Sequence, residues 1–288
     1  MRTIKDNKIT NAVIDLCLKA NFSLRSDALN QLKSAYKKEA NKKAKSALKA
    51  IIENAGIARQ ERLAICQDTG LPLVFVEIGQ DVKILGDFKK AIMKGIILGY
   101  RKGSFRESIV CDPLLRGNPS YEGAIIHTDI VKGNKIEITL VPKGFGCENK
   151  SQLKMFLPTA GIDEIKKFVV EVVKSAGPDA CPPYIVGVGI GGSADYACLL
   201  AKKALLKKIN CAGPKGLGRK GLSPKGTVPE LERELFYDIN KLHIGPMGLG
   251  GKATCLAVNI ETYPTHIAGL PVAVNISCHA LRSAKIVL

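Results

Sequence analysis

The sequence of 288 residues contains no tryptophan and few aromatic residues of any kind, because Phe, Tyr and Trp together make up 5% of it. No two cysteines have the C-x-x-C spacing, which excludes zinc fingers and thioredoxin-type chemistry. No apolar run approaches the roughly 20 residues of a transmembrane helix, so no membrane span is predicted. Residues 1–6 are not followed by an apolar signal core, and we therefore expect a cytoplasmic protein.

Acidic residues are few relative to basic ones: 26 Asp and Glu stand against 43 Lys and Arg, for a net charge of +17. The surplus is concentrated in residues 1–50, which hold twelve basic and four acidic residues, and in 202–225, which hold eight basic residues and no acid. One interpretation is a nucleic-acid-binding protein. Because aromatic residues are not interleaved with the lysines, stacking on bases is not indicated, and we expect no nucleic-acid partner. The pattern favours solvated lysine faces that attract an acidic small molecule or protein.

Apolar spacing predicts a mixed α/β (α+β) fold in a single domain, residues 1–288. Residues 1–62 form a predicted helical N-terminal region, with a short helix at 10–19 and a long one at 26–59 that begins at the capping residue Ser26. A mixed β-sheet with flanking helices follows, and 211–229, rich in Gly, Pro and Lys, is predicted to be a surface loop. The predicted strands are 72–78, 123–131, 135–141, 184–188, 253–260 and 271–277, and the predicted helices are 86–100, 162–176, 193–208 and 229–242.

Two predicted strands, 123–131 and 135–141, are separated only by Lys132-Gly133-Asn134. Both alternate in polarity and carry β-branched residues, which predicts an antiparallel hairpin.

A glycine-rich turn, Gly187-Val188-Gly189-Ile190-Gly191-Gly192, follows a predicted strand and precedes a predicted helix. It matches the G-x-G-x-x-G motif of dinucleotide-binding folds, which also need an acidic residue about 20 residues further on. After Asp195 the next acid is Glu230. A dinucleotide-binding oxidoreductase therefore stays an alternative from another class of protein, and the same turn could instead bind a carboxylate or pack closely on its neighbours.

Nine cysteines are present, and in the cytoplasm they would be kept reduced. We expect Cys17 and Cys198, in predicted helices, and Cys255, in a predicted strand, to be packing residues. Cys111 and Cys147 lie in predicted turns. Three others lie where a loop meets a regular element, which is where a fold can direct a ligand into a cleft; these are Cys66, Cys181 and Cys278. Their spacing alone leaves metal ligation and packing both open.

Several long segments carry a family resemblance from about Cys66 to the C-terminus. In chain order they are Ile65–Gly70, Glu148–Met155, Cys181–Pro183, Val186–Gly192, Leu199–Leu205, Gly245–Lys252 and Thr265–Asn275, which is followed by Cys278. The chain resembles the α subunit, or N-terminal catalytic region, of the class I fumarases and L-tartrate dehydratases, a family of iron–sulfur hydro-lyases.

The resemblance implies a 4Fe–4S cluster held by the thiolates of Cys66, Cys181 and Cys278. Four thiolates would saturate the four irons, whereas three leave one iron open. An open iron can act as a Lewis acid toward a substrate hydroxyl and carboxylate.

Four further residues acquire roles from the resemblance. Gln67 and Asp68 would face the open iron, with Asp68 a candidate for proton transfer; capping a turn is the alternative role of Asp68. Arg106 would bind a substrate carboxylate with its two-pronged guanidinium, or else form a surface ion pair with Glu107. His266 would hydrogen-bond a carboxylate or be a satisfied structural residue, and the turn at 143–146 would offer backbone N–H groups.

The implied reaction is reversible hydration or dehydration of a four-carbon hydroxy-dicarboxylate, with hydration of fumarate to malate the first choice and dehydration of L-tartrate the second. The chain departs from the family near the expected substrate: 118–123 is Asn-Pro-Ser-Tyr-Glu-Gly, Phe145 replaces a glycine, and Cys147 replaces a serine. The smaller swivelling domain of the family is not found in these residues. The resemblance therefore implies a separate β subunit and an α₂β₂ assembly, although an α subunit that has lost its partner would keep the fold without the activity.

Overall fold

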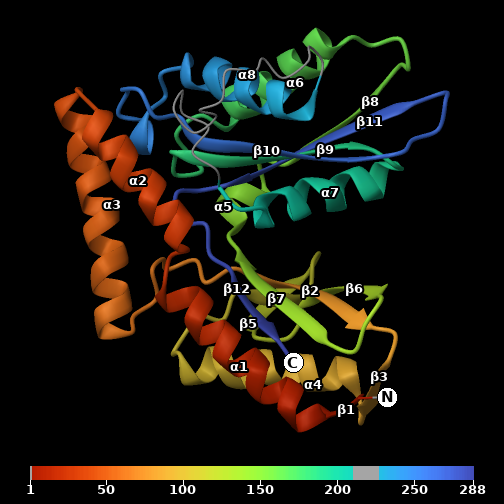
Figure 1. Ribbon diagram of the computed structural model, residues 1–288. Helices are drawn as coiled ribbons and strands as arrows, with labels where there is room; N and C mark the ends of the chain where they lie inside the picture. The colour runs from red at the N-terminus through yellow and green to blue at the C-terminus, as the bar shows by residue number, and fades with distance from the viewer. Residues whose placement is uncertain (1, 210–226) are drawn as a thin grey trace. The chain divides into compact units, whose positions relative to one another are not determined.

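The computed structural model describes residues 2–209 and 227–288, in which the chain forms two compact units (Figure 1). Unit 1 consists of the residues up to Arg25, Asn54–Phe145 and Arg282–Leu288, and unit 2 of Ser26–Glu53 and Gly146–Leu281.

The surface loop predicted at 211–229 lies mostly outside the described residues. No helix in the described part of the chain is long and apolar enough to cross a bilayer.

Unit 1 is built on a four-stranded sheet in the order β12-β7-β2-β6. The central strand β2 pairs antiparallel with β7 on one side and parallel with β6 on the other. Side chains of β2 and β7, among them Val74, Val76 and Ile138, pack in one core with helices α1 and α4. The elements of unit 1 are β1 (Arg2–Lys5), α1 (Asp6–Phe22), β2 (Leu71–Gly79), β3 (Val82–Leu85), α4 (Phe88–Lys102), β4 (Ile109–Asp112), β5 (Arg116–Ser120), β6 (Ile125–Val131), β7 (Ile136–Lys143) and β12 (Ala284–Val287).

Two glycines one helical turn apart let α4 lie close to α1. A Cβ on Gly95 would come within 2.7 Å of the Thr10 carbonyl oxygen, and a Cβ on Gly99 within 2.8 Å of Cys17 Cβ. The absence of side chains at these positions thus sets the spacing of the two helices that cover the sheet.

Unit 2 contains a second four-stranded sheet, in the order β10-β9-β11-β8, with helices on both faces (Figure 1). Apolar residues of α6 and α8, such as Val169 and Leu235, share a core with Val186 on β9. On the opposite face α7 packs through Ala197 and Ala201. The elements of unit 2 are α2 (Ser26–Lys38), β8 (Gln152–Phe156), α6 (Ile162–Ala176), β9 (Tyr184–Gly191), α7 (Ala194–Leu206), α8 (Val228–Asn240), the 3₁₀ turn η1 (Pro246–Gly248), β10 (Cys255–Tyr263) and β11 (Leu270–Ser277). Two further helices, α3 (Lys42–Glu61) and the short α5 (Phe145–Glu148), span boundaries between the units. The mixed α/β fold predicted from the sequence is confirmed.

The glycines of the G-x-G motif serve the packing of α7 on β9. A Cβ on Gly187 would lie 2.2 Å from the Ala201 carbonyl oxygen, and one on Gly189 would lie 2.1 Å from that of Ala197. Only glycine permits this approach of the helix backbone to the strand. Moreover, β9 has one parallel neighbour, β10, and one antiparallel neighbour, β11, unlike the parallel sheet of a dinucleotide-binding fold.

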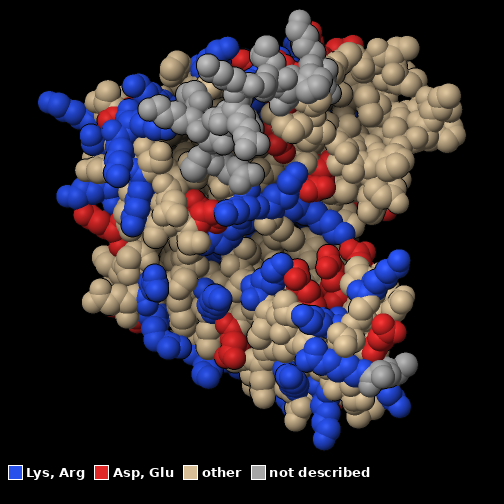
Figure 2. Space-filling model, viewed as in Figure 1, with Lys and Arg blue, Asp and Glu red and all other residues tan. Residues whose placement is uncertain are grey.

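The long helix predicted at 26–59 is wrong in one respect, because two helices, α2 and α3, occupy this region. Glu39 Oε1 accepts hydrogen bonds from the backbone N–H groups of Ala40 and Asn41, both at 3.0 Å. Asn41 Oδ1 then accepts from the N–H groups of Lys43 and Ala44. Asn41 is thus the N-cap of α3, and this local side-chain capping ends one helix and begins the next. Lys and Arg gather over both helices on the face drawn in Figure 2.

The hairpin predicted from 123–131 and 135–141 is also wrong in its pairing. Both strands exist as β6 and β7, but each pairs with β2, which lies between them. The apolar strand β2 is mostly buried and forms backbone hydrogen bonds with a neighbouring strand on each side. A three-residue connection between two strands does not by itself require that they pair with each other.

Candidate active site

Cys66 lies in unit 1, in the loop between α3 and β2. Its side chain is half-buried, and the neighbouring Gln67 is exposed. Asp68 is held at both carboxylate oxygens: Oδ1 accepts from Gly70 N–H at 3.0 Å and Oδ2 from Phe145 N–H at 2.8 Å. Asp68 therefore does cap the turn, and it accepts from one of the backbone N–H groups that the turn at 143–146 was expected to offer, that of Phe145.

Arg106 lies in the same unit and is connected to this loop through the backbone. Thr69 Oγ1 donates to the Arg106 carbonyl oxygen at 3.0 Å. The Arg106 side chain is exposed, and among residues 2–209 and 227–288 its guanidinium forms no ion pair, with Glu107 or with any other acid. An unpaired guanidinium of this kind can accept a carboxylate as a bidentate partner.

Cys181 and Cys278 lie in unit 2, at the start of β9 and the end of β11 respectively. His279 brings their loops together, since its backbone N–H donates to the Cys181 carbonyl oxygen at 3.3 Å and its Nδ1 lies 3.1 Å from the same oxygen. Both cysteine side chains are half-buried. Cys181 itself has a positive φ of 59°, an uncommon backbone conformation for a residue other than glycine.

The glycine-rich segment 245–252 lies beside Cys181. The N–H of Met247 donates to the Pro182 carbonyl oxygen at 2.8 Å. A Cβ on Gly248 would come within 2.4 Å of Pro178 Cβ, so this position accepts no side chain without movement. The backbone of this segment therefore packs closely against the Cys181 loop.

Glu148, in another of the segments that carry the resemblance, has a structural role. Its carboxylate is paired with Lys202 on α7, and its Oε2 accepts from Asn275 Nδ2 at 2.9 Å. Asn275 Nδ2 also donates to Ser151 Oγ. Cys147 donates its S–H to the Ala180 carbonyl oxygen at 3.2 Å, which ties α5 to the residue before Cys181.

His266 is exposed in the loop between β10 and β11. Its Nδ1 accepts from Ala268 N–H at 3.1 Å, so in the neutral ring the proton is on Nε2, which is left to donate outward. His266 precedes β11 and Cys278 follows it, and eight residues of extended strand separate them, a distance of about 26 Å. The end of unit 2 that carries His266 also exposes Ile267 and Leu157, and is uncharged on the face drawn in Figure 2.

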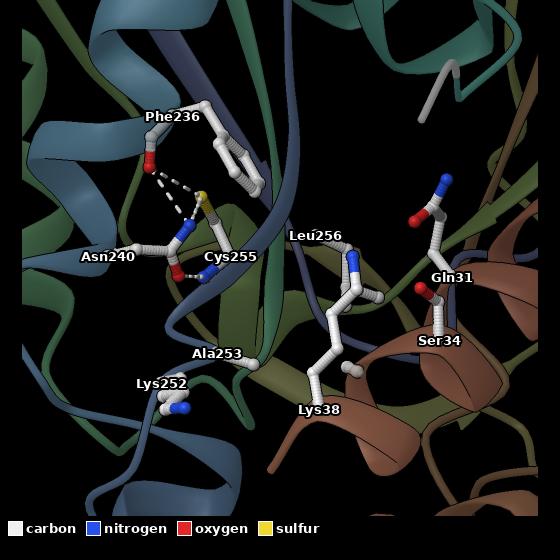
Figure 3. Close-up of a pocket in the computed structure, with 10 residues that line it drawn as sticks. Gln31, Ser34, Lys38, Phe236, Asn240, Lys252, Ala253, Cys255 and Leu256 are labelled. Carbon is white, nitrogen blue, oxygen red and sulfur yellow. Dashed lines mark hydrogen bonds between the residues drawn. The ribbon is translucent and has the colours of Figure 1, made fainter. Parts of the chain in front are cut away.

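A pocket of about 170 Å³ lies within unit 2, against α2, α8 and β10, and contains none of the predicted site residues (Figure 3). It includes Cys255, which is 2% exposed and whose Sγ lies 3.5 Å from Asn240 Nδ2. Burial raises the pKa of the Cys255 thiol and that of Cys17 on α1. Both cysteines are packing residues, as predicted.

Six of the seven predicted residues thus fall in two groups, with Cys66, Gln67, Asp68 and Arg106 in unit 1 and Cys181 with Cys278 in unit 2. His266 is in unit 2 as well, but at the opposite end of β11 from Cys278. No set of three or more His, Cys, Asp or Glu in the described part of the chain is arranged to hold a metal ion. Sequence reasoning missed His279, which joins the Cys181 and Cys278 loops, although it is adjacent to a predicted ligand.

Comparison with known proteins decides the family. Residues 10–287 match the model of the family described as Fumarate hydratase (Fumerase). The chain belongs to the fumarate hydratase family. It is therefore a hydro-lyase, as the sequence predicted, and membership in this family implies an iron–sulfur cluster in general terms.

Several relatives of the chain carry the name of an L(+)-tartrate dehydratase subunit. A protein of Methanocaldococcus jannaschii, provisionally named L(+)-tartrate dehydratase subunit alpha, is 42% identical, with 96% of each chain covered. The L(+)-tartrate dehydratase subunit alpha of Escherichia coli O157:H7 is 30% identical, covering 98% of this chain and 91% of its own length. That of E. coli K12 is 29% identical with the same coverage.

Proposed function

We propose that residues 1–288 act as one catalytic subunit that reversibly adds water to fumarate to give malate. The observation that carries the proposal is the pair of cysteine-bearing sites in a family member: Cys66 beside Asp68 and Arg106, and Cys181 linked to Cys278 by His279. Dehydration of L-tartrate, with loss of one hydroxyl and the proton of the neighbouring carbon as water, is the second candidate, which the names of the relatives favour.

We further propose that Cys66, Cys181 and Cys278 hold a 4Fe–4S cluster. Iron–sulfur clusters are bound by thiolates, and all three side chains are half-buried where loops meet regular elements. Burial raises the pKa of Cys17 and Cys255 and disfavours their thiolates. When bound through three thiolates, the cluster would offer one open iron as a Lewis acid for the departing hydroxyl.

The remaining residues of unit 1 would bind and orient the substrate. The exposed guanidinium of Arg106 would bind one carboxylate in bidentate fashion. Asp68 would hold or transfer a proton at a carboxylate oxygen, whose position is set by the N–H groups of Gly70 and Phe145. Gln67, exposed beside it, would offer an amide donor to the substrate.

His266 would donate from Nε2 to a substrate carboxylate. Because it lies at the opposite end of β11 from Cys278, we place this role at the site of a second copy in an α₂β₂ assembly. Complementation tests it: mixing His266→Ala chains with Cys278→Ser chains should restore part of the activity that each lacks alone. No recovery from mixed chains would show that His266 does not act in a neighbouring copy.

The proposed assembly includes a β subunit, as the name "subunit alpha" implies for the relatives. The proposed location of the assembly is the cytoplasm. The test is co-expression with a candidate β subunit, anaerobic cluster reconstitution, and assays with fumarate, malate and L-tartrate. Cys66→Ser, Cys181→Ser and Cys278→Ser should each lose the visible absorbance of the cluster and the hydration activity. Cys111→Ser, at an exposed thiol, is the matched control and should keep both. If all three variants keep full cluster content and activity, the proposal fails.

A further inference from the structure

Arg282 is a buried cation in unit 1, two residues before the start of β12. Its side chain is 3% exposed, and among the described residues it forms no ion pair. Nη1 donates to Asn21 Oδ1 at 3.1 Å and Nη2 donates to the Asp68 carbonyl oxygen at 2.7 Å, whereas Nε has no hydrogen-bond partner in residues 2–209 and 227–288. Burial of a guanidinium without a carboxylate partner is costly, so this arrangement requires a reason beyond packing.

The two hydrogen bonds of Arg282 connect to both sides of the Cys66–Gln67 dipeptide. On one side, Asn21 accepts from the guanidinium with its side chain and from Ile65 N–H with its backbone carbonyl oxygen, at 3.0 Å. On the other side, the guanidinium holds the Asp68 carbonyl directly. Asn21 is itself fixed, because it is fully buried and donates from Nδ2 to the Cys17 carbonyl on α1. Arg282 thus connects both ends of the loop to a buried helix.

Neighbouring contacts extend this support. Tyr100 Oη donates to the Thr69 carbonyl oxygen at 2.9 Å, and Thr69 Oγ1 donates to the Arg106 carbonyl oxygen. A Cβ on Gly144 would lie 3.1 Å from Asp68 Oδ2 and 3.7 Å from Arg282 Nη2. The glycine therefore lets the turn before Phe145 approach both groups.

We infer that Arg282 is a positioning residue for the Cys66–Asp68 segment, acting through the Asp68 carbonyl and Asn21. It sets where the Cys66 thiol and the Asp68 carboxylate lie, without contacting substrate itself. Its effect on catalysis rests on the proposed function of these two residues, but its effect on the backbone does not. Lysine cannot replace it fully, because one ammonium lacks the planar fork that reaches two separate acceptors.

The experiment compares Arg282→Met and Arg282→Lys with Lys285→Met, a matched control on β12 whose side chain is 56% exposed and pairs with Glu137. Hydrogen exchange followed by mass spectrometry is measured on the full chain before cluster reconstitution. Peptides covering residues 65–70 should exchange at least about tenfold faster in Arg282→Met and by an intermediate factor in Arg282→Lys, and the control should match wild type. Peptides from unit 2 should be unchanged in every variant.

After reconstitution with the β subunit, kcat should fall on the order of 10²-fold in Arg282→Met, the size expected from small misplacement of reacting groups, with a smaller change in KM. Added guanidinium ion should restore part of the protection of 65–70 in Arg282→Ala, whereas methylammonium should not.

Unchanged exchange at 65–70 in a folded variant, or faster exchange spread evenly over unit 1, would overturn the inference and indicate a merely structural residue. If Arg282→Met does not fold, Arg282→Lys and the guanidinium titration decide the matter. Altered exchange together with an inactive, cluster-free wild type would refute the proposed function and leave the positioning role intact.

Discussion

Gly189 allows α7 to approach β9 closely, and replacing it with alanine tests that packing. The new Cβ would lie 2.1 Å from the Ala197 carbonyl oxygen and 2.6 Å from the Ala201 backbone nitrogen. Since ordinary contacts begin near 3.4 Å, α7 must move away from β9 by roughly 1 Å. Overpacking of this kind costs about 1–3 kcal/mol. For a unit of this size that lowers the melting temperature by roughly 2–12 °C.

Circular dichroism melts of wild type, Gly189→Ala and Gly56→Ala measure the effect. Gly56 lies in α3 with nothing within 4 Å of its added Cβ, and alanine there should raise helix stability by about 0.5–1 kcal/mol. A Gly189→Ala midpoint equal to that of wild type would refute the assignment of this glycine to helix packing.

Three further predictions concern single side chains. Tyr100→Phe removes the donor to the Thr69 carbonyl and should lower the free energy of unfolding by about 1–3 kcal/mol, measured by urea titration; an unchanged midpoint would contradict it. The hydrogen bond to Glu234 raises the pKa of Lys166 above its ordinary 10.5. The contribution of this hydrogen bond to folding stability should therefore be present below pH 10.5 and be lost as the pH rises through the raised pKa. The difference in melting temperature between wild type and Lys166→Met should accordingly shrink above pH 10.5, and a constant difference would contradict the prediction. Burial raises the pKa of Cys255, so this thiol should resist labelling at pH 8 in the native chain and react only in denaturant; mass spectrometry would show early labelling if this is wrong.

Local sequence signals predicted most elements of the fold, because apolar periodicity and cap residues act within a few positions. The helix at 162–176 coincides with α6, and the strand at 271–277 lies within β11. What local patterns could not supply was pairing: β6 and β7 are adjacent in sequence, yet β2 lies between them. Strand partners depend on which apolar surface is available in the whole fold, not on the strands alone.

The candidate site was predictable from the segments around Cys66, Cys181 and Cys278, each marked by its neighbours in the chain. The supporting contacts were not. Arg282 donates a hydrogen bond to the Asp68 carbonyl oxygen across 214 positions of sequence. No local sequence feature around Arg282 predicts that its side chain is buried. Such residues are recognised only when the hydrogen-bond partners of the backbone are known.

The division of the chain among the two units has a consequence for synthesis on the ribosome. Unit 1 needs Arg282–Leu288, which supply the edge strand β12 paired with β7 and the guanidinium beneath the Cys66 loop. These residues are translated after all of unit 2. Until that segment emerges, the sheet of unit 1 is incomplete and the edge of β7 that pairs with β12 stays uncovered. During this interval the nascent chain would depend on chaperones or on rapid folding of unit 2 to avoid aggregation at an unpaired edge.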